Sequence, residues 1–411
     1  MNQIKIKDEA KVKFALGILK KSLYQGFEYE LYSNILLFSI DIQGISSINE
    51  RKDILFSAVS RFSRYNDHSL DSFKQAIAEE INERKQKTPQ MFTVIFLLNI
   101  DRILIEKKKY FTVCGNKLYH RTHSYISKHF NLKKFVNETK LVGNHLVIKL
   151  PFDPNIFQHI ECRVIGRNAT EAFWKAYENF ELLRAILNFS NNFRTFHIQL
   201  GTRSHLNSFL PSPFYIIFNE KGDYEYFRYE IGNYKYKVAK HSIHYQPKVF
   251  IRLLQLFKTQ PKENSIQELV LEGITKYGQA LDSLDWESNF LKLWRVLELI
   301  TFYSEDSSIR STANRINLLF GQNLFWKYSI DSICELRNIL VHKGIFPEEG
   351  LEQLCILKNL VEHCIWQLVL FCRYFDNAED LRIFYELVSC PSSNLRKKIK
   401  VINNILKTRK K

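Results

Sequence analysis

Helical and strand-like spacings of hydrophobic residues alternate along residues 1–160. Residues 71–87 are polar with helical periodicity, whereas residues 93–100 and 140–150 have the patterns of strands. The last of these segments contains Gly143 and Asn144, a pair typical of a hairpin turn. We therefore predict an α+β fold for this part of the chain.

The most apolar run of the sequence, residues 91–105, is interrupted by Asp101 and Arg102. Its unbroken part is about half of the ~20 residues that a membrane-spanning helix needs. The run therefore predicts a buried strand, and we expect no membrane partner.

A helical pattern begins after Asn168, which can cap the helix, with Glu171 three positions later as in a capping box. Residues 211–218 and 224–239 then have strand patterns, and the second contains the turn pair Gly232–Asn233. The middle segment, residues 161–262, is therefore also predicted to be α+β. The apolar positions with helical spacing after Asn168 are Phe173, Ala176, Tyr177, Phe180, Leu183 and Leu187.

From Ser265 onward every pattern is helical, with turns predicted at 304–308, 321–323 and 347–350. We predict an all-α bundle over residues 263–376, followed by C-terminal helices with a basic tail over residues 377–411. The long helical patterns cover 266–281, 284–301 and 351–375, and the shorter ones surround 311–320 and 332–340.

The net charge and the cysteine content indicate an intracellular protein that binds polyanions. A formal net charge of +16 and a pI near 9.3 favour nucleic acid as a partner. Seven scattered cysteines without a C-x-x-C pair indicate neither a disulfide framework nor a zinc ribbon, and residues 1–13 lack a targeting signal. We therefore expect a cytoplasmic location.

The C-terminal segment predicts an amphipathic helix that combines an apolar face with many cations. Leu395, Ile399, Ile402 and Leu406 share a helical face. Two interpretations stay open, a basic tail that contacts RNA phosphates and a solvated terminal helix. The cations proposed to contact RNA here are Arg396, Lys397 and Lys398.

The stretch ELRNILVHKG, residues 335–344, concentrates candidate chemistry in one short helical pattern. Asn338 and His342 are four residues apart and share a face, whereas Arg337 lies about 7.5 Å along the axis from His342 and is rotated by roughly 140°. Gly344 predicts the end of the helix. His342 would then lie in the last turn, where partial negative charge favours the protonated imidazole.

These residue types suit RNA cleavage without a metal ion. The 2′-hydroxyl must lose a proton, the 5′-oxygen must gain one, and charge on the phosphate must be stabilised. Histidine can fill either proton role near neutral pH, arginine matches phosphate oxygens, and asparagine can orient either group. From the spacing alone, an ion-paired arginine and a histidine at a helix end is the alternative.

LRNILVHKG resembles the signature of HEPN domains, and ESNFLKLWRVLELI (residues 287–300) is similar to the second helix of the HEPN branch in ApeA-type anti-phage proteins. RSTANRINLLFG (residues 310–321) stands where that branch has a connecting helix, so the resemblance covers residues 265–375. It implies a helical bundle that dimerises and joins two R-x4-H motifs in one metal-independent endoribonuclease cleft.

By this resemblance Arg337 would bind the scissile phosphate, His342 would be the general acid or base, and Asn338 would be the polar residue after the arginine. Glu298 is the candidate for the acidic residue of the second helix, with Glu287 as the alternative, and Glu298 can instead pair with Arg295. Lys343 and Arg295 are further candidates for RNA contacts.

The resemblance also implies a role in prokaryotic anti-phage defence by abortive infection, with tRNA among the candidate targets. Expected products carry a 2′,3′-cyclic phosphate and a 5′-hydroxyl, and no cofactor or metal is expected. Expected partners are the RNA substrate, a second copy of the chain, and a phage-derived trigger or an antitoxin. The alternatives are a non-catalytic HEPN module for dimerisation and nucleic-acid binding, and the toxin of a toxin–antitoxin pair.

Two other groups of residues have weaker patterns. His120, His123 and His129, and the pair His241 and His244, have spacings seen in zinc sites but no acidic or cysteine ligand nearby. The tyrosines of residues 224–237 alternate with lysines, which is typical of a half-exposed hairpin and also of a surface for base stacking. These are Tyr226, Tyr229, Tyr234 and Tyr236, with Lys235 and Lys237.

Overall fold

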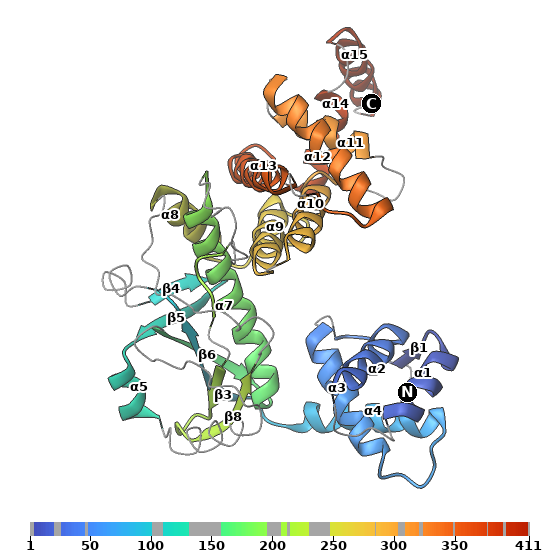
Figure 1. Ribbon diagram of the computed structural model, residues 1–411, viewed down its shortest axis with the longest axis vertical. Coiled ribbons are helices and arrows are strands. Elements are labelled where there is room, and N and C mark those ends of the chain that lie inside the picture. Colours follow the sequence, from blue (N-terminus) through green and yellow to red (C-terminus); the bar gives the residue numbers. More distant parts are fainter. Residues whose placement is uncertain are drawn as a thin grey trace.

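The computed structural model of the chain describes most of its residues. The described ranges are 4–19, 26–45, 48–100, 110–130, 158–194, 207–211, 214–229, 247–283, 285–302, 309–319, 324–347, 350–375, 377–388 and 392–409. Within them the predicted class is confirmed, because two antiparallel sheets precede a C-terminal region of helices. Figure 1 shows an N-terminal body, a sheet crossed by helix α7, and the C-terminal helices. The domain boundaries stay predictions.

The N-terminal body has a hydrophobic core of its own, which includes Val12, Leu36, Ile54 and Phe73. The helix predicted over residues 71–87 is confirmed, and it begins where the Ser69 hydroxyl accepts a hydrogen bond from the Ser72 N–H. The elements of this body are β1 Ile4–Ile6, α1 Glu9–Leu19, α2 Gly26–Ser39, β2 Ile40–Ile42, α3 Ile48–Phe62 and α4 Leu70–Gln86.

The second sheet is antiparallel throughout, with described strands in the order β4-β5-β6-β3-β7-β8. The apolar run at residue 91 is a buried strand, as predicted, because β3 is fully buried from Phe92 to Leu98. The sheet takes strands from both sides of residue 160, so the first two predicted segments share a core. Its strands are β3 Gln90–Leu98, β4 Tyr110–Val113, β5 Asn116–Arg121, β6 Gln158–Gly166, β7 Phe214–Phe218 and β8 Tyr224–Tyr229.

The side chains of this sheet alternate between two different environments. Phe96, Leu118 and Cys162 point into the core formed with α7, Ala169–Asn192, which crosses the sheet (Figure 1). On the opposite face Ile95 and Ile216 pack with Ile126 of α5, His123–His129.

Helix α7 confirms the helical pattern and the cap predicted from the sequence. The Asn168 side chain accepts a hydrogen bond from the Glu171 N–H at 2.8 Å. The Glu171 carboxylate in turn accepts from the Arg167 N–H at 2.8 Å, one residue earlier than in a standard capping box.

The strands predicted at residues 211 and 224 pair with each other as β7 and β8, across a turn where the Asn219 N–H donates to the Asp223 carbonyl. Gly222 provides the positive φ of 80° that this turn requires. The predicted hairpin turns at 143–144 and 232–233 lie outside the described residues.

The C-terminal region is helical, as predicted. Helix α9 begins where the Ser265 hydroxyl accepts a hydrogen bond from the Glu268 N–H, and α10 begins where the Asp285 carboxylate accepts one from the Ser288 N–H. The pattern at 332–340 belongs to a longer helix of 20 residues. The helices are α8 Pro247–Leu256, α9 Ile266–Leu281, α10 Trp286–Ile300, α11 Ile309–Leu319, α12 Leu324–Lys343, α13 Gly350–Phe371, α14 Ala378–Val388 and α15 Ser392–Arg409.

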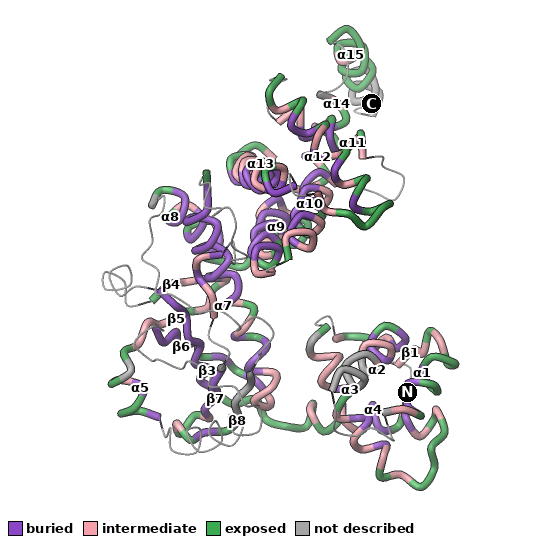
Figure 2. The backbone as a smooth tube through the Cα atoms, viewed as in Figure 1, coloured by how far each residue is buried: buried purple, intermediate pink, exposed green. Residues whose placement is uncertain are grey.

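Helix α13 is long and apolar enough to cross a membrane by length and composition alone. However, 61% of its most apolar window is buried inside the protein. Leu357, Val361, Ile365 and Leu368 belong to the core shared with α9 and α10, as the buried colour of α13 in Figure 2 illustrates. It is therefore a core helix, and nothing in the described residues indicates a membrane partner.

Helix α15 is exposed over most of the part whose side chains the structure describes (Figure 2). Its predicted apolar face is also exposed, since Ile399 and Ile402 are 56% and 53% accessible. The basic residues and the apolar residues of this helix are therefore both available to a partner.

Candidate active site at the end of helix α12

The end of α12 has the geometry that the sequence predicts. Gly344 has a positive φ of 63°, and its N–H donates to the Leu340 carbonyl at 2.9 Å. This is a glycine C-cap with the left-handed conformation that closes many helices. His342 therefore lies in the last turn, followed by Lys343.

The two faces of α12 differ as expected from the residue spacing. Ile333, Leu336 and Leu340 are buried against the bundle. Asn338 and His342 are both exposed, one turn apart on the outward face. The imidazole is thus open to a ligand from solvent and is not enclosed by hydrocarbon.

Arg337 has an unusual environment for a cation. It is half-buried, and its Nε atom is shielded from solvent without a hydrogen-bond partner among the described residues. Buried charges in proteins are normally paired, so an unpaired guanidinium has unused capacity to bind an anion. One turn earlier, burial raises the pKa of Cys334 to about 11, so this thiol is protonated near neutral pH and is no nucleophile.

Arg337 and His342 do not interact within one copy of the chain. Five residues separate them, which corresponds to about 7.5 Å along the axis and a rotation of roughly 140°. Arg337 lies at the edge of the buried face, and His342 lies on the exposed face. A single α12 therefore offers one phosphate-binding group and one proton-transfer group in different directions.

Glu298 lies half-buried in the last turn of α10. Its carboxylate accepts a hydrogen bond from the Trp294 Nε1–H at 2.6 Å. It forms no ion pair with Arg295 or with Arg337, all three being described residues. Glu287, the alternative, is in the first turn of α10, about 16 Å away along the axis.

The outward face of α12 also carries large apolar side chains. Leu324, Phe325 and Tyr328 are 64%, 63% and 66% exposed, and Ile339 is 37% exposed. By helical spacing Leu324, Tyr328 and Ile339 lie within about 60° of His342 around the helix and Phe325 about 100° from it, but Leu324, Phe325 and Tyr328 are about 21–27 Å from His342 along the axis. Exposed apolar side chains of this size along one helix are typical of a surface that contacts another protein.

The other predicted RNA contacts are exposed but are distributed over three helices. Lys343 ends α12, and Arg295 projects from α10. The three cations of the basic tail, Arg396, Lys397 and Lys398, lie on α15. The structure brings Arg337, Asn338, His342 and Lys343 together on one helix end, and it leaves the α15 residues on a separate element.

The described residues do not assemble a metal site from three or more His, Cys, Asp or Glu side chains. His120 instead hydrogen-bonds Gln158 through its Nε2 at 2.7 Å. His241 and His244, and the tyrosines and lysines of residues 230–237, lie outside the described residues.

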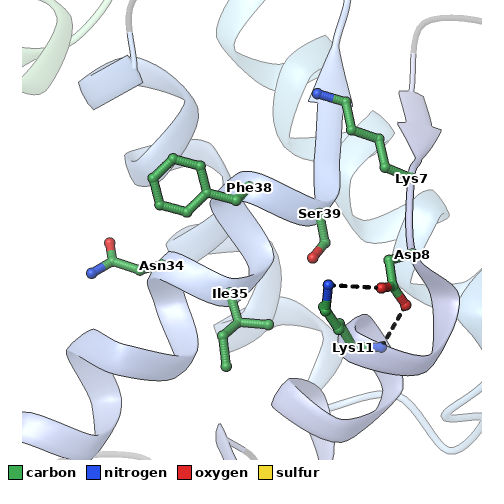
Figure 3. A pocket seen from close by; sticks show the side chains of 7 residues that line it. All are labelled: Lys7, Asp8, Lys11, Asn34, Ile35, Phe38 and Ser39. Carbon is green, nitrogen blue, oxygen red and sulfur yellow. Dashed lines mark hydrogen bonds and ion pairs between the residues drawn. The ribbon is translucent and has the colours of Figure 1, made fainter. Parts of the chain in front are cut away.

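An open cavity of about 580 Å³ lies in the N-terminal body, between the start of α1 and the end of α2 (Figure 3). Asp8, which caps α1 through the Lys11 N–H, occupies one side of it, and Phe38 lies at the other. None of the predicted site residues lines this cavity, which is formed by Lys7, Asp8, Lys11, Asn34, Ile35, Phe38 and Ser39.

Comparison with known proteins found no matching family model, no matching curated protein and no matching solved structure. In residues 119–123 only His120 and His123 were considered from the sequence, as possible zinc ligands, whereas Tyr119 and Arg121 belong to an unpredicted row of aromatic and cationic side chains on the sheet. The alternation of Arg163 and Ile165 with the buried Cys162 and Val164 on β6 is the sequence signal for it.

Proposed function

We propose that the protein is a metal-independent endoribonuclease whose active site is built on the end of α12. The observation that carries this proposal is the half-buried Arg337, whose Nε is shielded and has no hydrogen-bond partner among the described residues, about one and a half turns before the exposed His342. An anion held by Arg337 would supply the countercharge that the described residues do not. The resemblance of residues 335–344 and 287–300 to HEPN domains supports the same assignment.

The reaction is an internal transesterification. The 2′-oxygen of the RNA attacks phosphorus while the bond to the 5′-oxygen breaks, which yields a 2′,3′-cyclic phosphate and a 5′-hydroxyl. His342 moves a proton, either from the 2′-hydroxyl or to the 5′-oxygen. Arg337 stabilises the negative charge on the non-bridging phosphate oxygens, and Asn338 orients the imidazole or the phosphate.

A homodimer fits this chemistry better than a single copy. Two proton transfers are needed, whereas one α12 provides one histidine, and its arginine faces another way. The exposed apolar stripe of α12, Leu324, Phe325, Tyr328 and Ile339, is the surface through which two copies would meet. Pairing of two α12 helices side by side and in parallel along this stripe would bring two copies of the Arg337–His342 motif to one cleft.

The cellular role that follows is cytoplasmic RNA cleavage in anti-phage defence, with tRNA among the targets. The N-terminal body and the sheet would then sense infection or restrain the nuclease. An antitoxin from a separate gene is the alternative source of restraint.

The test is RNA cleavage by the purified protein in excess EDTA. We expect cleavage by the parent and a loss of at least 100-fold for His342→Ala and for Arg337→Ala. His68→Ala is the matched control, because His68 is an exposed histidine of the N-terminal body. Equal cleavage by folded His342→Ala protein would reject the proposal.

One observation favours a second candidate, a non-catalytic module that binds nucleic acid. Arg337 and His342 do not touch in one copy, so without pairing they form no complete site. This candidate predicts salt-sensitive RNA binding that persists in His342→Ala, and no cleavage at any protein concentration.

A further inference from the structure

One exposed part of the six-stranded sheet carries aromatic and basic side chains in register. Tyr110 of β4 is directly opposite Tyr119 of β5, and Tyr119 is opposite Glu161 of β6. The rings of Tyr110 and Tyr119 are 5.5 Å apart. Because side chains alternate between the faces of a sheet, all of these project away from the core under α7.

Cations are interleaved with these rings. The Lys117 Nζ lies 5.1 Å from the Tyr110 ring centre. The Arg121 guanidinium lies 4.7 Å from the Tyr119 ring and 4.2 Å from the ring of Tyr125 in α5. The stack continues from Tyr125 to His129, whose rings are 4.0 Å apart with an interplanar angle of 22°.

The local charge of this surface is positive. The one carboxylate among the described residues of this surface, that of Glu161, is completely buried and accepts from Arg121 at 2.6 Å and from Arg163 at 2.7 Å. Two arginines thus share one carboxylate, and Lys117 has no acidic partner within the described residues. The surface therefore retains unneutralised cations that can contact phosphates.

The surface is accessible at its edge. Tyr110 is 42% exposed, the Arg163 side chain is 50% exposed, and Ile165 beside it is 57% exposed. The sheet's other face is covered by α7, so this is the face of β4, β5 and β6 on which a ligand can lie (Figure 1).

We propose that the face formed by Tyr110, Lys117, Tyr119, Arg121 and Arg163 binds a single-stranded polynucleotide. Bases stack on the exposed ring of Tyr110, phosphates pair with Lys117 and Arg163, and Arg121 holds the rings of Tyr119 and Tyr125 in place. The favoured ligand is single-stranded RNA. This surface needs neither Arg337 nor His342, so binding here is separable from cleavage at α12.

The test measures binding of a fluorescein-labelled 12-residue oligouridylate by fluorescence anisotropy, with full-length His342→Ala protein so that cleavage cannot interfere. Adding Tyr110→Leu removes the ring but keeps an apolar side chain, and should weaken binding at least about fivefold. Adding Lys117→Gln should reduce the slope of log affinity against log salt by about 0.7. Lys74→Gln, the same charge change on α4, is the matched control and should alter neither.

Two controls identify the ligand chemistry. A 12-residue oligothymidylate that binds equally well would support the polynucleotide surface and show that the 2′-hydroxyl is not read there. Unchanged oligouridylate affinity in both Tyr110→Leu and Lys117→Gln would overturn the proposal and leave the face to a protein partner or to none. A 12-base-pair RNA duplex that binds as tightly, without sensitivity to Tyr110→Leu, would also overturn it.

Discussion

At the residue scale, the most consequential side chain away from the candidate site is Glu362 of α13. It is completely buried, pairs with Lys358 at 2.7 Å, and accepts hydrogen bonds from the Tyr277 hydroxyl and the Arg194 N–H. Lys358 also donates to the Asn192 carbonyl at the end of α7. This network joins α7, α9 and α13, and burial raises the pKa of Glu362 despite its partners.

Replacing Glu362 by Ala should therefore be strongly destabilising. The change leaves Lys358 buried without its carboxylate, and breaking a buried pair costs about 3–5 kcal/mol. The loss in free energy of unfolding is measured by thermal and urea unfolding, followed by circular dichroism. Glu272→Ala is the matched control, because Glu272 forms an i,i+4 pair with Lys276 that is exposed, and its loss should cost less than about 0.5 kcal/mol. Equal losses from the two variants would contradict the account.

We expect Glu171 to make the stability of the folded protein depend on pH in the acidic range. Burial alone would raise its pKa, but hydrogen bonds from Lys175 and from the Arg167 N–H hold the pKa below the ordinary value of 4.5. A lowered pKa in the folded state gives stability that is present above pH 4.5 and is lost as the pH falls through the folded value. Glu171→Gln should flatten the decline in melting temperature below pH 4.5. A decline as steep as that of the parent would show that this carboxylate does not contribute.

At the element scale, the ends of helices were predictable because their signals are local. Asn168 with Glu171 caps its helix as the sequence indicates, and Gly344 ends α12. The full length of α12 was not predicted, because the exposed Leu324, Phe325 and Tyr328 break the amphipathic pattern at its start. The strand pairing across residue 160 was not predictable either, since register between distant segments leaves no local signal.

The candidate site was predictable only in part, for the same reason. Spacing places Arg337, Asn338 and His342 on one helix, and the structure confirms that helix and its end. Spacing does not show that Arg337 lies at the edge of the buried face without a partner, because its surroundings come from the packing of other helices. Spacing likewise does not show that the Glu298 carboxylate accepts a hydrogen bond from the Trp294 Nε1–H, because this contact depends on packing and on the side-chain rotamers.

The glycine that ends α12 gives a direct prediction. Gly344→Ala should lower the free energy of unfolding by about 1 kcal/mol, since a side chain at a left-handed φ is strained. No atom lies within 4 Å of the added Cβ, so steric overlap does not contribute. Chemical denaturation checks the value. Gly17→Ala, at a helical position in the last turn of α1 with equally open space, is the control and should be neutral or stabilising.

We expect the protein to form a dimer through the outward face of α12. Phe325→Asp places a charge on the proposed dimer surface and should convert the dimer to a folded monomer, as measured by sedimentation velocity. Phe14→Asp is the matched control, because Phe14 is similarly exposed, at 59%, on α1 of the N-terminal body. If Phe325→Asp sediments as the parent does, the two copies do not meet through this face.

At the scale of the whole molecule, the sheet and the helical bundle share one core, whereas the N-terminal body has its own. A buried ion pair between Arg184 of α7 and Asp282, at 2.6 Å, fixes the sheet region to the start of the bundle. The N-terminal body is linked by the Trp174 Nε1–H, which donates to Asp53 of α3 at 2.5 Å. The candidate nuclease site and the proposed RNA-binding face therefore lie on elements that share one core, and the N-terminal body is a separate unit available for regulation.

The measurement that tests the central claim most directly is the end-group chemistry of RNA incubated with the protein in EDTA. Mass spectrometry of the fragments from parent protein should show 2′,3′-cyclic phosphate and 5′-hydroxyl ends, and these fragments should be absent with His342→Ala. Fragments with 5′-phosphate and 3′-hydroxyl ends, or cyclic-phosphate fragments that form equally with His342→Ala, would contradict a transesterification carried out by Arg337 and His342.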